Sequence, residues 1–270
     1  MSVAAIVLGA KLLLTPLLIA AATVAARRWG STVGGLLAGL PLTSGPVSVF
    51  LAIEHGPAFA TVAARATLLG LIGVAAFCIG YARTATVLGW FGSWAAGMAL
   101  WSLAVLGLSS ARLSLSASVA AVASTLVAAT LTTRGLPAAP AHAPAHVRDL
   151  PWRIATATGM VLILTAAAGQ LGPTWSGFLS PFPVFASVMA VFSHRTQGPG
   201  ASIGLLRGVI AGSFAFAGFF VVVALLLESS GMATTYSLAA VAAVVVNVVS
   251  LRRLLRISYA ASARSRALIP

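Results

Sequence analysis

Two arginines, Arg65 and Arg207, lie in otherwise apolar stretches and are the residues best suited to binding chemistry. Each follows a Gly-Pro pair, Gly56-Pro57 or Gly198-Pro199, by about eight residues, so it lies roughly 12 Å into an apolar helix that rises 1.5 Å per residue. A charge at that depth is costly and usually faces a bundle interior or an aqueous cavity. Because arginine stays charged and presents a forked set of donors, we expect both residues to bind a carboxylate or a phosphate. The alternatives are a guanidinium that caps helix carbonyls and one that snorkels to the headgroups.

Prolines interrupt two further apolar stretches, with Pro41, Gly45 and Pro46 in the first and Pro181 and Pro183 in the second. Proline removes a backbone donor and breaks a helix, and irregular backbone at membrane depth is tolerated only where protein or a watery cavity receives it. A helix that restarts after Pro46 or Pro183 presents unpaired N–H groups and a positive dipole end, which attract anions. The predicted substrate site is completed by side chains beside the breaks: Thr43, Ser44, Ser48, Phe185 and Ser187. The alternatives are hydroxyls bonded to their own helix, and prolines that kink a helix without binding a ligand.

The remaining polar residues indicate neither a metal site nor an enzyme. Glu54, one of only three acidic residues, follows the first break and either carries a coupling proton or lies solvated at the interface. His142 and His146 have a metal-like spacing, but no carboxylate or cysteine cluster accompanies them, so we expect a solvated linker and no metal. The single Cys78 excludes an internal disulfide. The sequence has no paired carboxylates within an apolar span, no plausible Ser/His/Asp set and no nucleotide-binding glycine pattern, so it predicts no enzyme and no cofactor.

The composition of the chain is that of a polytopic all-α membrane protein. Of its 270 residues 60% are hydrophobic and 7% are charged, and the mean hydropathy is +1.05, whereas soluble domains carry about 25% charged residues. The net charge of +13 comes mostly from short connections without interleaved aromatics, which argues against nucleic acid as a partner. Apolar windows long enough to cross a bilayer predict about nine spans, near residues 4–25, 33–53, 58–82, 85–107, 113–132, 154–171, 176–194, 201–227 and 233–251.

Arginines are distributed unequally between the two predicted sides of the membrane. One side receives twelve of them: Arg27, Arg28, Arg83, Arg134, Arg148, Arg153, Arg195, Arg252, Arg253, Arg256, Arg264 and Arg266. The other side receives Arg112, together with Glu54 and Glu228. Because positive residues remain in the cytoplasm, this predicts an outside N-terminus and a cytoplasmic C-terminus in a bacterial inner membrane.

The two interrupted spans belong to a longer internal repeat. A shift of 142 residues aligns Gly35 with Gly177, Pro41 with Pro183, Arg65 with Arg207, and the fourth span with the ninth. The predicted architecture is therefore a four-helix repeat (1–110), a linking helix with a Pro/Ala-rich loop (111–152), a second four-helix repeat (153–256) and a basic tail (257–270). Five crossings separate the starts of the two repeats, and this odd number makes them inverted, an arrangement typical of transporters with a site at the repeat interface.

The second repeat carries the motif GFLSPFPVFASVMAVFSHRTQGPGASIGLLRGVI, residues 177–210. Its Phe-Pro-x-Phe break at 182–185, its glycine turn at Gly198 and its Arg207 resemble the GlpM family of small four-helix bacterial inner-membrane proteins. The first repeat keeps only the proline, the glycine turn and Arg65, and its break, LPLTSGP, departs from the aromatic pattern. The resemblance implies a fused, inverted pair of four-helix units and a loose association with envelope polysaccharide production.

Together these features predict a secondary transporter or translocator, which moves a small or lipid-linked anion through rocking of the two repeats. The alternative is a non-transporting accessory protein that scaffolds envelope polysaccharide synthesis, and a channel is a third possibility. The expected partners are the lipid bilayer, the anionic solute, and either a second copy of the chain or an envelope-biosynthesis protein.

Overall fold

The computed structural model describes residues 3–42, 44–111, 113–138, 149–168 and 173–267, and the regular structure in these segments is entirely helical. Thr43, His142, His146, Arg112 and Arg148 lie outside the described residues. The helices are α1 (Val3–Trp29), α2 (Ser31–Ala38), α3 (Ser44–His55), α4 (Pro57–Thr84), α5 (Trp90–Ser109), α6 (Leu115–Arg134), α7 (Leu150–Ala168), α8 (Pro173–Leu179), α9 (Val184–Gln197), α10 (Pro199–Ser230) and α11 (Met232–Ala267).

Six stretches in the described part of the chain are long and apolar enough to cross a membrane: Pro57–Thr84, Trp90–Ser109, Leu115–Arg134, Gly177–Gln197, Pro199–Ser230 and Met232–Arg252. The fourth of these runs through the break between α8 and α9. The predicted all-α class is therefore confirmed, and the apolar helices suggest a membrane-embedded protein. The count of nine spans stays a prediction.

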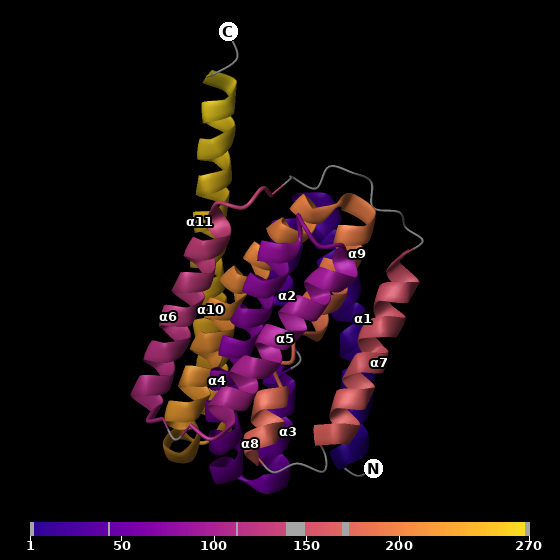
Figure 1. The fold of residues 1–270 in the computed structure, drawn as a ribbon. Helices are drawn as coiled ribbons and strands as arrows, with labels where there is room; N and C mark the ends of the chain where they lie inside the picture. Colours follow the sequence, from indigo (N-terminus) through magenta and orange to yellow (C-terminus); the bar gives the residue numbers. More distant parts are fainter. Residues whose placement is uncertain (1–2, 43, 112, 139–148, 169–172, 268–270) are drawn as a thin grey trace.

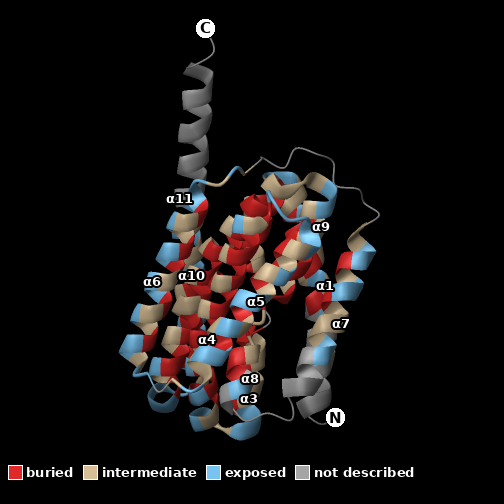
Figure 2. Ribbon diagram, in the orientation of Figure 1, coloured by how far each residue is buried: buried red, intermediate tan, exposed pale blue. Residues whose placement is uncertain are grey.

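Helices α4 and α10 form the centre of the bundle and pack against each other (Figure 1). Their residues are largely buried, in contrast to α5, α6 and α11, which expose many large apolar side chains at the periphery (Figure 2). Helices α5 and α8 pack on α4, helices α2 and α11 pack on α10, and α6 contacts both central helices. An exposed apolar surface is what a helix bundle presents to lipid, since lipid chains do not penalise it.

Both predicted breaks are present, between α2 and α3 and between α8 and α9. Helix α9 begins at Val184, directly after Pro183, as the sequence predicts. Helix α3, however, begins at Ser44 and not after Pro46, so that prediction is wrong. Pro46 lies in the first turn of α3, where its missing N–H removes no helical hydrogen bond.

Glycine brings the short helices unusually close to the two central ones. A Cβ built on Gly35 of α2 would overlap the carbonyl oxygen of Leu205 on α10. Likewise, a Cβ on Gly177 of α8 would lie 2.5 Å from the carbonyl oxygen of Ala63 on α4. Positions 35 and 177, and also 63 and 205, differ by the shift of 142 residues found in the sequence. The two contacts are therefore equivalent, and backbone meets backbone at both.

The turns before α4 and α10 are equivalent in the same way. Gly56 and Gly198 have φ angles of 86° and 85°, and each is followed by a proline that opens the next helix. A positive φ strains any residue with a Cβ, whereas glycine adopts it freely, and proline suits the first helical position. Both central helices therefore start from the same local conformation.

Most of the arginines that are described lie at one end of the bundle, called here the arginine end. They occupy the last turns of α1, α4, α6 and α9 and the first turn of α7. Arg27 of α1 contacts Asp149 beside α7, and Tyr81 near the end of α4 contacts His194 near the end of α9. Glu54 lies at the opposite end, called the Glu54 end (Figure 1). Which membrane holds the protein, and which end faces the cytoplasm, stay predictions.

Candidate functional site

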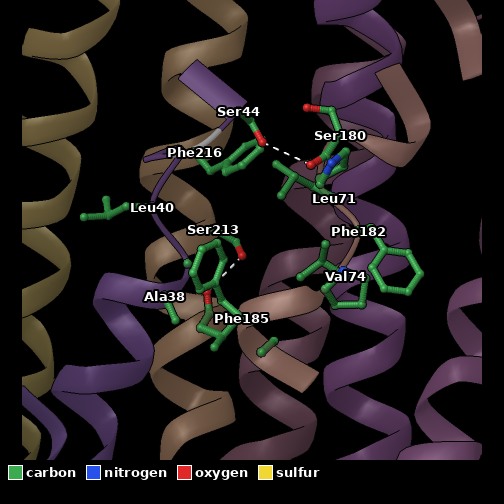
Figure 3. Close-up of a pocket in the computed structure, with 15 residues that line it drawn as sticks. Ala38, Leu40, Ser44, Leu71, Val74, Ser180, Phe182, Phe185, Ser213 and Phe216 are labelled. Carbon is green, nitrogen blue, oxygen red and sulfur yellow. Dashed lines mark hydrogen bonds between the residues drawn. The ribbon is translucent and has the colours of Figure 1, made fainter. Parts of the chain in front are cut away.

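A cavity of about 50 Å³ lies between the two helix breaks (Figure 3). It is lined by residues 38–40 and 44 of the first break, residues 180–183, 185 and 186 of the second, Leu71 and Val74 of α4, and Val209, Ser213 and Phe216 of α10. The breaks are about 140 residues apart in the chain, and their meeting at one cavity is what irregular backbone inside a membrane requires.

The cavity is lined by hydroxyl, aromatic and aliphatic groups. The Ser44 Oγ donates to the carbonyl oxygen of Ser180 at 3.1 Å and so joins the two breaks directly (Figure 3). The Ser213 Oγ donates to the Val209 carbonyl of its own helix at 2.9 Å. The described lining residues include no charged side chain. A ligand here would meet hydroxyls, backbone and phenylalanine rings.

The size of the cavity limits what it holds in this conformation. A volume of about 50 Å³ has room for a few water molecules, since one water needs about 10–15 Å³ measured in this way. Pockets for drug-sized ligands measure roughly 300–1,000 Å³. A larger solute therefore requires the two breaks to move apart.

Arg207 caps a helix and does not line the cavity. Its Nε donates to the Thr133 carbonyl at 2.9 Å, and its Nη2 bonds the carbonyls of Thr133, Arg134 and Leu136, the last two at 2.8 and 2.6 Å. These carbonyls lie at the C-terminal end of α6, where helical partners run out and the dipole is negative. The guanidinium thus satisfies the end of the linking helix.

Arg65 has a different environment from Arg207, although the two occupy equivalent positions in the sequence. Its side chain is exposed on the surface of α4, and it makes no hydrogen bond to any described residue. Arg65 follows the start of α4 at the Glu54 end, whereas Arg207 follows the start of α10 at the arginine end (Figure 1). The structure therefore brings the two arginines neither together nor into the cavity.

The other predicted site residues divide into two groups. Ser44, Pro181, Pro183 and Phe185 line the cavity, and Pro41 lies buried in the first break. Ser48, Ser187, Gly45 and Pro46 do not line it, and Gly45 faces the ring of Phe219 instead. Thr43 lies outside the described residues.

Ser48 and Ser187 each bond an aromatic side chain. The Tyr236 hydroxyl of α11 donates to the Ser48 carbonyl at 2.8 Å and lies 2.9 Å from the Ser48 Oγ. The Trp94 Nε1 of α5 donates to the Ser187 Oγ at 2.7 Å. Trp94 and Tyr236 are themselves 142 residues apart, a correspondence through which the repeat alignment could have found them.

Glu54 lies at the end of α3, with 39% of its side chain exposed and an oxygen 4.0 Å from the His55 Nε2. It does not line the cavity. Within the described segments, no group of three or more histidine, cysteine or acidic side chains could hold a metal ion.

One charged cluster was missed by the sequence reasoning. Asp149 lies between Arg27, whose Nη2 is 3.1 Å from Asp149 Oδ1, and Arg153, whose Nη2 is 2.7 Å from Asp149 Oδ2. The Arg153 side chain is only 2% exposed, and its guanidinium also lies over the Phe192 ring. The spacing of Asp149 and Arg153, four residues apart on a helix, was an available signal for this pair.

Comparison with family models, with curated proteins and with solved structures finds no match for this chain. The resemblance to the GlpM family stays a prediction.

Proposed function

We propose that this protein is a secondary transporter or translocator built from two inverted four-helix repeats, residues 1–110 and 153–256, joined by a linking helix and crossing the membrane nine times. The observation that carries the proposal is the cavity lined by both helix breaks. Discontinuous helices that meet near the membrane midplane are a recurring plan of secondary transporters, in which they bind the substrate. The matching contacts of Gly35 with Leu205 and of Gly177 with Ala63 support an inverted repeat.

The proposed substrate is a small or lipid-linked anion with an apolar part. The first turns of α3 and α9 both contribute to the cavity lining, and helix N-termini favour negative charge through their free N–H groups. Ser44 and Ser213 add hydroxyl groups, and Phe182, Phe185 and Phe216 add an apolar wall. In this proposal the anion is held by backbone and hydroxyl donors, and Arg65 and Arg207 take no part.

The experiment is ligand-induced stabilisation of the purified protein by carboxylates, inorganic phosphate and lipid phosphates. A ligand at about 100 times its dissociation constant raises the free energy of unfolding by roughly 2.7 kcal/mol. We expect one class of anion to stabilise the wild type, and Ser44→Ala and Phe185→Ala to lose the effect. Arg65→Gln serves as the matched control, because this residue is exposed and outside the cavity.

Two outcomes contradict the proposal. If Arg65→Gln abolishes the stabilisation and the cavity variants keep it, the site lies elsewhere. If none of the anions stabilises the wild type, the accessory role in envelope polysaccharide synthesis becomes the better hypothesis.

A further inference from the structure

The two halves of each broken helix are attached to the rest of the bundle in different ways. The first halves, α2 and α8, are locked onto the central helices by close glycine contacts with backbone. A Cβ at Gly39 would lie 2.5 Å from the Val209 carbonyl oxygen, and a Cβ at Gly70 would lie 2.5 Å from Pro181 Cγ. Because these surfaces already touch without side chains between them, the repeats have little freedom to rock against each other.

The second halves, α3 and α9, are less firmly fixed to the opposite repeat. Helix α3 meets α11 through the Tyr236–Ser48 contact, and α9 meets α5 through the Trp94–Ser187 contact. We call these two contacts the latches. Each joins the second half of one broken helix to the last helix of the other repeat, and Trp94 and Tyr236 occupy equivalent positions. Two equivalent polar contacts in equivalent places indicate a shared role.

We infer that α3 and α9 are two gates, that each swings about its helix break, and that the latches hold them closed over the central cavity. This inference rests on the proposed transport function and replaces the rocking of whole repeats with the movement of two half-helices. Helix α3 covers the cavity from the Glu54 end, and α9 covers it from the arginine end (Figure 1). Opening one gate at a time gives the cavity access to one side of the membrane at a time.

The breaks have the properties that hinges require. The described part of the first break, residues 39–42, and the second break, residues 180–183, lack continuous helical hydrogen bonds, so a small change in backbone angles redirects the following helix. Ser44 and Ser180 join the two hinges at the cavity itself, where a bound solute would displace their hydrogen bond. Binding and gate movement are thereby coupled through the same atoms.

The test is the accessibility of the cavity to a charged, membrane-impermeant maleimide applied from each side of the membrane. The reporter is Ser213→Cys in a Cys78→Ala background. Ser213 lines the cavity on α10, which is not a gate, and Ser213 and Cys78 are both almost fully buried. The two gates are released separately. Tyr236→Phe releases α3, and Trp94→Phe with Tyr81→Phe releases α9, because Tyr81 also bonds His194 on that helix at 3.2 Å.

We expect Tyr236→Phe to speed labelling from the Glu54 end alone, and the Trp94→Phe/Tyr81→Phe variant to speed it from the arginine end alone. Loss of one hydrogen bond of ordinary strength corresponds to about a twofold to tenfold change in rate. The matched control is Thr130→Val, because the Thr130 hydroxyl bonds only its own helix, at the Leu126 carbonyl, and its removal leaves both rates unchanged.

Ser48→Ala and Ser187→Ala remove the partners of the two latches and reproduce the respective effects, so the test does not depend on the aromatic variants alone. Equal acceleration from both ends, or no acceleration in any folded latch variant, overturns the inference. The assay uses no solute, so its outcome is independent of the proposed function. One-sided opening without anion-dependent stabilisation leaves the gates standing and removes the proposed substrate class.

Discussion

The substitution Gly208→Ala tests how tightly α2 and α10 are interlocked. A Cβ at this position would overlap the carbonyl oxygen of Thr32 and lie 2.7 Å from the Leu36 nitrogen. Both obstacles are backbone atoms, so one helix must shift. Overpacking of this kind costs about 1–3 kcal/mol, whereas replacing glycine by alanine within a helix gains at most about 1 kcal/mol. We therefore expect a net loss of about 1–2 kcal/mol in the free energy of unfolding.

Gly218→Ala is the matched control on the same helix. A Cβ there would lie 3.6 Å from the Val246 Cγ2, which is ordinary van der Waals contact. The gain in helix propensity is then unopposed, and the variant should unfold with unchanged or slightly higher free energy. Reversible unfolding in mixed micelles, followed by circular dichroism, compares the two variants directly. If Gly208→Ala proves as stable as Gly218→Ala, the helices are not interlocked and the argument against rocking repeats fails.

The equivalent pair extends this test to the repeat. Gly35→Ala would place a Cβ on the Leu205 carbonyl, and Gly177→Ala would place one against the Ala63 carbonyl. Since the two contacts are related by the shift of 142 residues, we expect similar losses of about 1–2 kcal/mol. A large loss in one variant and none in the other would argue against equivalent packing of the two repeats.

Three further predictions concern the charged residues and the thiol. Arg207→Gln should destabilise the protein by about 1.5–3 kcal/mol, because it uncaps the end of α6, whereas Arg65→Gln should be nearly neutral in thermal unfolding; equal effects would refute the capping role. Asp149→Ala leaves the guanidinium groups beside it without their carboxylate and should cost about 3–5 kcal/mol in the same assay, against little for Glu228→Gln at the bundle surface; a neutral Asp149→Ala would show that the cluster contributes nothing to folding. Cys78 is fully buried and should react with a permeant maleimide only after denaturation, as mass spectrometry would detect, and rapid native labelling would contradict this placement.

Much of the local structure could be predicted from the chain. The helical class follows from composition, and both breaks follow from prolines in apolar stretches. The turns at Gly56 and Gly198 follow from the Gly-Pro pairs, since glycine accepts the positive φ and proline opens the next helix. The starting point of α3 was misjudged because proline is harmless in a first helical turn, so Pro46 does not mark the boundary.

The site itself was only partly predictable. Ser44 and Phe185 line the cavity as expected, because they lie within or beside the breaks. Ser48 and Ser187 lie one further turn along their helices, where an aromatic ring from the other repeat reaches them. Nothing in the local sequence of a serine distinguishes a ligand-facing hydroxyl from one that bonds a neighbouring helix.

What the sequence determined by itself is the set of properties that depend on neighbouring residues: apolar length, helix interruption, glycine turns and the unequal distribution of arginine. What only the tertiary structure decided is which distant groups meet. Arg65 and Arg207 look equivalent in the sequence, yet the carbonyl end of α6, about 74 residues before Arg207, lies beside Arg207 alone. A helix has one carbonyl end and one N–H end, so a linking helix next to an inverted pair cannot offer the same partner to both arginines.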